Sequence, residues 1–150
     1  MASDPAAIPA RLRLNAWTGG RSGVSGKVAA GATGWAVRRR LGRMDRRRTD
    51  ELPPGEVTVR VAWSSLNYKD ALGATGHPGV NKVFPHVPGV DAVGTVAASG
   101  AYEWVEGDRV LVTGFDMGSN RWGGYAELVR VPQEWVLPLP PGLTFEESMM

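Results

Sequence analysis

The sequence predicts a mainly β fold, and two observations support this expectation. In residues 51–150, short apolar stretches of strand length recur, and clusters of proline and glycine separate them. Within these stretches only residues 67–72 suggest a helical turn. Many short strands joined by glycine-rich turns are typical of a small barrel or sandwich.

The first expected strand is residues 57–63, which follow a Pro-Pro-Gly turn. Val57, Val59, Val61 and Trp63 alternate with more polar residues, so we expect them to share the buried face of this strand. Near the end of the chain, Thr144 and Glu147 have the spacing of a capping box and predict the start of a helix. The further strand candidates are residues 90–97, 109–113, 125–131 and 135–139.

Length and composition exclude several protein classes. The chain has 150 residues, enough for one ordinary domain, and no cysteine. A disulfide scaffold, a thiolate-bound zinc or iron–sulfur site and a cysteine nucleophile are therefore excluded. No stretch approaches the roughly 18 apolar residues that cross a bilayer, and the opening residues do not form a secretory signal. We expect a cytoplasmic protein.

The net charge of +2 hides two segments of opposite charge. Residues 1–50 carry eleven Lys and Arg against three Asp, whereas residues 51–150 carry six basic and twelve acidic side chains. The first segment is rich in glycine and arginine and shows neither helical nor strand periodicity, so we expect a basic, disordered segment followed by a folded domain over 51–150. An alternative is that the basic segment is an arm that binds nucleic acid.

The segment with the most candidate catalytic or ligand-binding side chains is residues 64–72, directly after the first expected strand. Its sequence is Ser-Ser-Leu-Asn-Tyr-Lys-Asp-Ala-Leu. Asn67, Tyr68 and Asp70 bring an amide, a phenol and a carboxylate to one turn, a common location for ligand contacts. Helix capping offers another explanation, with Asn67 as the N-cap and Asp70 as an acid of the first turn. From the residue types alone, capping is favoured.

Residues 64–72 resemble the segment after the first long strand in zinc-independent medium-chain dehydrogenases/reductases, in particular the acrylyl-CoA reductase and putative quinone oxidoreductase branch. Three further blocks resemble that family in the same order, and together the four blocks cover about residues 51–150. These blocks are FPHVPGVDAVGTV at 84–96, GDRVLVTG at 107–114 and RWGGYAE at 121–127.

Departures from the zinc alcohol dehydrogenases favour the zinc-independent branch. Asn67 stands where those enzymes have a zinc-binding cysteine, and Val90 stands where they have a histidine ligand. A zinc site needs three or four clustered ligands. His77 and His86 are the two histidines, and both lie beside proline-rich turns. We expect no metal site.

The resemblance implies a GroES-like catalytic domain, a partly open β-barrel, and an NADPH-dependent reduction of an activated double bond in a small-molecule enoyl thioester or quinone. It implies that Tyr68 donates a hydrogen bond or a proton and that Asn67 binds a carboxamide, a ribose hydroxyl or a substrate oxygen. Tyr68 and Asn67 would therefore also contact the cofactor, and Asp70 would orient the turn. Trp122 would border the substrate, or else simply anchor its glycine turn.

Two features of the family are not evident in the chain. The Gly-x-Gly-x-x-Gly fingerprint of a Rossmann nucleotide-binding domain is absent, and residues 1–50 show no sign of the family's opening strand pair. We therefore expect an incomplete barrel without its Rossmann domain, inactive alone and weak in NADPH binding. The alternatives are a non-enzymatic GroES-like interaction module, which would form a homo-oligomer, and the nucleic-acid binder. No membrane partner is expected.

Overall fold

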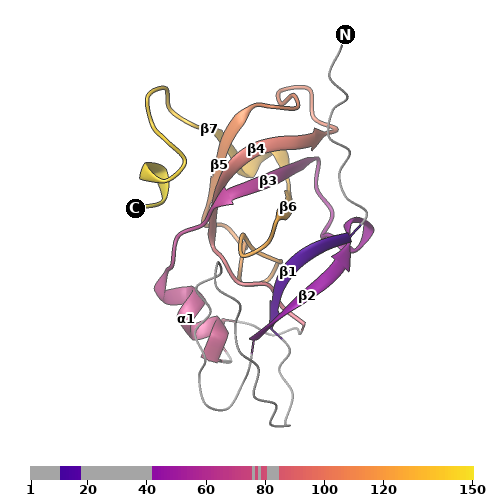
Figure 1. Ribbon diagram of the computed structural model, residues 1–150, viewed down its shortest axis with the longest axis vertical. Coiled ribbons are helices and arrows are strands. Elements are labelled where there is room, and N and C mark those ends of the chain that lie inside the picture. Colours follow the sequence, from indigo (N-terminus) through magenta and orange to yellow (C-terminus); the bar gives the residue numbers. More distant parts are fainter. Residues whose placement is uncertain (1–10, 18–41, 76, 78, 81–84) are drawn as a thin grey trace.

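The computed structural model describes residues 11–17, 42–75, 77, 79–80 and 85–150. Its centre is a five-stranded antiparallel sheet with the strand order β6-β3-β4-β5-β7 (Figure 1). One α-helix, α1 (Tyr68–Thr75), lies among the described residues. The mainly β prediction is therefore confirmed. The strands are β3 (Val57–Trp63), β4 (Asp91–Ser99), β5 (Arg109–Thr113), β6 (Leu128–Val131) and β7 (Val136–Pro138).

The predicted strands 57–63 and 109–113 coincide with β3 and β5, whereas β6 begins three residues later than the predicted strand 125–131. The difference has a backbone cause. The N–H groups of Gly124 and Tyr125 donate to the carbonyls of Gly89 and Pro88, so the chain here pairs with the segment before β4. Its first hydrogen bond with β3 is the one that the Glu127 carbonyl accepts from the Val61 N–H, and the paired strand begins at Leu128.

Two strands precede the region where the sequence predicted structure. β1 (Arg11–Trp17) and β2 (Gly42–Arg48) form a separate antiparallel pair, in which Arg11 lies opposite Arg48 and Trp17 opposite Gly42. The expectation that residues 1–50 are disordered and contain no strand pair is wrong for these two segments. Backbone pairing needs no apolar periodicity, which explains why the sequence pattern did not show it. The other residues of this predicted segment lie outside the described residues, apart from Thr49 and Asp50 in the 3₁₀ turn η1 (Thr49–Glu51).

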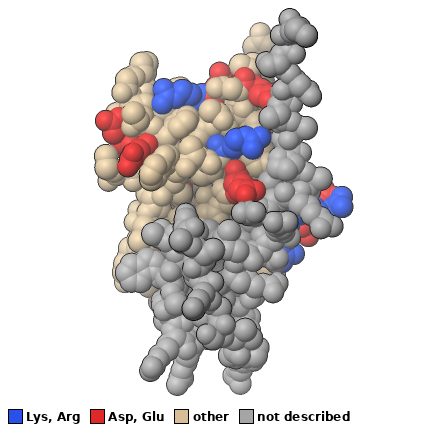
Figure 2. Space-filling model, in the orientation of Figure 1, with Lys and Arg blue, Asp and Glu red and all other residues tan. Residues whose placement is uncertain are grey.

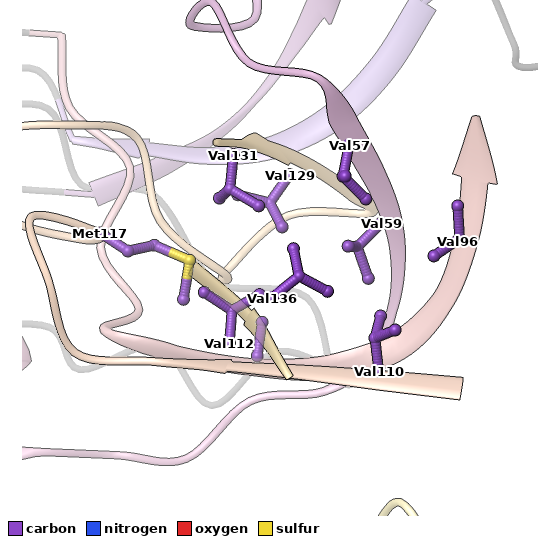
Figure 3. Close-up of a cluster of buried hydrophobic side chains, with 10 residues drawn as sticks. Val57, Val59, Val96, Val110, Val112, Met117, Val129, Val131 and Val136 are labelled. Carbon is purple, nitrogen blue, oxygen red and sulfur yellow. The ribbon is translucent and has the colours of Figure 1, made fainter. Parts of the chain in front are cut away.

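One of the two clusters of buried hydrophobic side chains consists mainly of valine. Figure 3 shows valines from all five strands converging on one another and on Met117, which is fully buried. β-branched side chains fit a pleated surface well because few rotamers are lost there. The buried members are Val57, Val59, Ala92, Val96, Val110, Val112, Met117, Val129, Val131 and Val136.

The prediction of which β3 side chains are buried is only partly correct. Val57 and Val59 are fully buried, but Trp63 is 49% exposed. The pairing of β3 with β4 shifts register between Thr58 and Val59 and again between Val61 and Trp63. Each irregularity of this kind changes the alternation of faces along a strand, so the period of two does not persist to Trp63.

The predicted capping box near the end of the chain is confirmed. The hydroxyl of Thr144 accepts a hydrogen bond from the Glu147 N–H at 3.1 Å, and the Glu147 carboxylate accepts one from the Thr144 N–H at 2.9 Å. The helical segment that follows is a single 3₁₀ turn, η3 (Glu147–Met149). A third such turn, η2 (Gln133–Trp135), leads into β7. Among the described residues, no helix is both long and apolar enough to span a membrane.

Glycines let three backbone segments touch at the end of the sheet where β4 begins. A Cβ atom on Gly123 would lie 2.3 Å from the Gly89 carbonyl oxygen and 2.6 Å from the Gly118 Cα. Contacts of this length are impossible for real atoms, and all of them involve backbone that cannot turn aside. Gly89 and Gly118 also have φ values of +104° and +72°, a region that favours glycine. Packing here depends on the absence of side chains.

We expect Gly123→Ala to lower the free energy of unfolding by about 2 kcal/mol or more, because overpacked methyl groups force backbone shifts. The matched control is Gly100→Ala, whose added Cβ would meet nothing closer than the Glu56 carbonyl oxygen at 3.9 Å. The measurement is urea unfolding followed by tryptophan fluorescence. Equal stabilities for the two variants would contradict the close backbone packing.

His86 is buried beneath the same segment, with 3% of its surface exposed. Its Nε2–H donates to the Gly118 carbonyl, with 2.8 Å between the two atoms. Burial lowers the pKa of His86, although the Gly118 carbonyl and the nearby Asp70 carboxylate act in the opposite direction. The folded protein therefore holds this imidazole in its neutral form down to a lower pH than the unfolded chain does.

This lowered pKa predicts a pH dependence of stability. As the pH falls below about 6.5, the unfolded chain binds a proton at His86 that the folded protein does not, so the free energy of unfolding decreases, by at most about 1.4 kcal/mol per pH unit. In His86→Gln, whose amide can also donate to Gly118, we expect a shallower decrease between pH 7 and 5.5. Denaturant unfolding at several pH values measures both slopes, and identical slopes would contradict the assignment.

Candidate functional site

The candidate site lies where β3 ends, β4 begins and β5 ends. Because the strands are antiparallel, these three points meet at one end of the sheet, and Asp91 of β4 lies directly opposite Thr113 of β5. Residues 64–67 leave β3 at the same end and lead into α1 (Figure 1). The turn singled out in the sequence is therefore placed beside the first residue of β4.

The carboxylate of Asp91 is the centre of this site. One oxygen, Oδ2, accepts hydrogen bonds from Ser65 Oγ at 2.6 Å and Asn67 Nδ2 at 2.6 Å. The other, Oδ1, accepts from Thr113 Oγ1 at 2.6 Å and the Gly114 N–H at 3.2 Å. Four donors from two segments of chain thus converge on one side chain.

These hydrogen bonds keep Asp91 ionised. Burial alone would raise the pKa of Asp91, but the hydroxyls of Ser65 and Thr113 and the amide of Asn67 outweigh it and hold the pKa below its ordinary value. Hydrogen bonds donated to a carboxylate favour its charged form. At neutral pH, Asp91 is therefore an acceptor only. Ser64 adds a further connection, since its hydroxyl donates to the Asp91 main-chain carbonyl at 2.6 Å.

Asp70 is buried below the turn, with 1% of its surface exposed. Its two oxygens accept the backbone N–H of Asn67 at 3.0 Å and that of Gly89 at 2.8 Å. Burial raises the pKa of Asp70, and the hydrogen bonds from these two N–H groups act against that shift. The side chain joins the start of α1 to the segment before β4.

Helix capping explains one of the two residues for which it was predicted. The Asn67 carbonyl accepts the N–H groups of Asp70 and Ala71, so Asn67 is the N-cap by position, and the Asp70 carboxylate reaches back to its N–H. The Asn67 side chain, however, donates to Ser65 Oγ at 2.8 Å and to Asp91 and does not cap the helix. Capping is therefore confirmed for Asp70 and wrong for the Asn67 side chain.

Tyr68 is the first residue of α1, and its side chain is 78% exposed. Leu66 and Trp63, which precede it, are 57% and 49% exposed. The half-buried Asn67 and the exposed Tyr68 are therefore neighbours on a turn held from below by Asp70 and Asp91. The structure brings an amide and a phenol together at the surface and places the Asp70 carboxylate beneath them.

Two further residues belong to this arrangement, and the sequence did not single them out. Asp91 is one, and Tyr125 is the other, since its phenol donates to the Ser65 carbonyl at 3.1 Å. Burial and the negative charge of Asp70 raise the pKa of Tyr125, so this phenol keeps its proton. The available signal for Asp91 was its position as an acidic residue at the start of a buried strand. No pattern in the sequence relates Tyr125 to Ser65, which lies 60 residues away.

Trp122 serves as an anchor in the described structure. Its Nε1–H donates to the Pro85 carbonyl at 3.2 Å, and its ring packs against the buried side chains of Leu52, Val87 and Leu128. This agrees with the structural alternative for Trp122, and its contact with a substrate remains a prediction. In the described part of the chain, no three His, Asp or Glu side chains are grouped so that they could hold a metal ion.

Comparison with known proteins relates this arrangement to a family. Residues 53–141 match the family described as "Alcohol dehydrogenase GroES-like domain". "Probable acrylyl-CoA reductase AcuI" of Escherichia coli strain K12 is 48% identical over 99 residues, 66% of this chain and 31% of that protein. "Putative quinone oxidoreductase YhfP" of Bacillus subtilis strain 168 is 38% identical over 102 residues, 68% of this chain and 31% of that protein.

Solved structures show the same relationship. The yhdH oxidoreductase of Salmonella enterica, crystallised in complex with NADP, superposes with a TM-score of 0.71 at 38% identity, covering 93% of this chain and 37% of that one. Bacillus subtilis yhfP, with NAD bound, gives a TM-score of 0.73 at 29% identity with the same coverage. The chain spans a little under a third of the length of the curated relatives described above. It belongs to the alcohol dehydrogenase GroES-like domain family, within the medium-chain dehydrogenase/reductase superfamily.

Proposed function

We propose that this chain is the catalytic-domain portion of a zinc-independent, NADPH-dependent reductase that acts on an activated carbon–carbon double bond. The substrate class is an enoyl thioester such as acrylyl-CoA, or a quinone. The observation that carries the proposal is the rigid turn that presents Asn67 and Tyr68, held by the carboxylates of Asp70 and Asp91. Relatives named as an acrylyl-CoA reductase and a quinone oxidoreductase support it.

The residues fit part of a bound nicotinamide nucleotide. Asn67 is half-buried and offers a polar group beside the exposed apolar side chain of Leu66, a combination suited to a flat ring with a polar substituent. The 150 residues contain no Gly-x-Gly-x-x-Gly fingerprint for the pyrophosphate. We therefore propose that tight NADPH binding needs a nucleotide-binding domain in addition to this one.

The proposed chemistry makes specific demands on the chain. When bound, NADPH would supply a hydride for the β-carbon of the double bond. The chain's own residues would then have to stabilise the negative charge on the thioester carbonyl oxygen and provide a proton for the α-carbon. Tyr68 carries an exposed phenol that can donate to this oxygen or deliver the proton. Asp70 is proposed as a positioning residue, because both its oxygens are occupied by backbone N–H groups.

The nucleic-acid alternative concerns the basic segment 1–50, most of which lies outside the described residues, and it does not extend to the folded part of the chain. Residues 51–150 carry twice as many acidic as basic side chains. On the face shown in Figure 2, Lys and Arg lie interspersed with Asp and Glu over the described part of the molecule. Binding to a phosphate backbone depends on a concentrated positive charge. The interaction-module alternative remains open to light scattering, in which it predicts a defined oligomer.

The proposed function can be tested by segment exchange. The 99 matched residues of the Escherichia coli relative are replaced by the corresponding residues of this chain. We expect the exchanged protein to oxidise NADPH in the presence of acrylyl-CoA and the 150-residue chain alone to show no turnover. An exchanged protein that folds and binds NADPH, yet reduces neither acrylyl-CoA nor a quinone, would refute the proposal.

Tyr68→Phe in the exchanged protein tests the proton donor. We expect kcat to fall about 100-fold, the usual contribution of a positioned acid, with unchanged stability because the phenol is exposed. Tyr102→Phe is the matched control, since this tyrosine is fully exposed in the loop between β4 and β5 and should leave kcat unchanged. Equal kcat for Tyr68→Phe and the unsubstituted exchanged protein would exclude the role.

A further inference from the structure

The side-chain nitrogen of Asn67 contacts two polar groups within the protein. Nδ2 lies 2.6 Å from Asp91 Oδ2 and 2.8 Å from Ser65 Oγ. Ser65 Oγ and Asp91 Oδ2 are themselves 2.6 Å apart, so both acceptors lie on the same side of the Asn67 nitrogen.

The chemistry of the partners fixes which way the amide faces. Asp91 is ionised and can only accept, so the Asn67 atom beside it must be the nitrogen. Ser65 has a single hydroxyl hydrogen, which it donates to Asp91 Oδ2 at 2.6 Å, so towards Asn67 it must accept. The three groups form a closed ring of hydrogen bonds. Rotating the amide by 180° would set its carbonyl oxygen against a carboxylate and break two of the three bonds.

The carbonyl oxygen of Asn67 is left facing away from this ring. Within the described part of the chain, no hydrogen bond is donated to Asn67 Oδ1. Nor does Oδ1 belong to the buried, unpartnered polar atoms of the described residues, and Asn67 as a whole is half-buried. The oxygen is therefore accessible to solvent and to a ligand.

We propose that Asp91 and Ser65 are positioning residues that orient Asn67 so that its carbonyl oxygen faces a ligand. Through this oxygen, Asn67 accepts a hydrogen bond from a hydroxyl or an amide N–H of a ligand. For the ligand's identity this inference rests on the proposed function. NADPH carries such donors on its carboxamide and ribose, whereas the thioester oxygen of the substrate is an acceptor. Three partners were expected for Asn67: a carboxamide, a ribose hydroxyl and a substrate oxygen. We retain the two cofactor groups for Asn67 and assign the substrate oxygen to Tyr68.

The orientation can be measured on the full chain without any ligand. In a ¹⁵N–¹H spectrum, we expect the Nδ2 proton of Asn67 that faces Asp91 and Ser65 to exchange slowly with solvent. Ser65→Ala should speed its exchange about tenfold or more, since one acceptor is lost. Thr113→Val is the matched control, because it removes a donor to the other oxygen of Asp91 and leaves both Asn67 contacts in place. Rapid exchange in the unsubstituted chain, or no effect of Ser65→Ala, would overturn the proposal.

The ligand preference is tested with NADPH on the exchanged protein. Asn67→Asp sets two carboxylates against each other and should raise the KM for NADPH about tenfold. The double variant Asn67→Asp/Asp91→Asn restores a donor–acceptor pair and leaves position 67 with acceptors alone. We expect it to recover most of this loss.

A folded double variant that recovers none of the NADPH affinity would show that Asn67 donates, and would overturn the proposal. Failure of the unsubstituted exchanged protein to reduce any substrate counts against the proposed function instead. In that case the exchange measurement on the full chain still decides the orientation of the amide.

Discussion

An ionised carboxylate placed at the end of an antiparallel sheet is the constraint on which the rest of this site depends. Asp91 is only half-buried, yet it collects donors from residue 65, residue 67 and the end of β5. A charge in that position is stable only while the donors remain, and each donor in turn is oriented by the charge. The turn after β3 is therefore held by electrostatics rather than by apolar packing, which explains how a short polar segment keeps one conformation at the surface.

The second support of the turn is backbone-to-backbone packing. Asp70 accepts the N–H of Gly89, whose carbonyl in turn accepts the Gly124 N–H and would collide with a side chain at position 123. The glycines contribute no chemistry of their own. They bring the chain segments close enough for the buried carboxylate of Asp70 to accept main-chain N–H groups from both, directly beneath Asn67 and Tyr68.

The sequence predicted the elements that depend on local patterns and missed those that depend on contacts distant in sequence. Strands β3 and β5 and the capping role of Asp70 follow from periodicity and spacing within a few residues. The hydrogen bond between Asn67 and Asp91 joins residues 24 apart and depends on the register of three strands, which no local pattern encodes. Trp63 was misplaced for a related reason, because a register shift is a property of two strands together.

The two outer strands of the sheet have a consequence for assembly. β6 has four residues and β7 three, and β7 ends at Pro138, which has no N–H to offer. Short edge strands give an incoming strand few hydrogen bonds to form, and the proline of β7 removes one more donor. Growth of this sheet by addition of strands from other molecules is thus disfavoured at both sides. A partner of this part of the protein would have to recognise side chains rather than extend the backbone ladder.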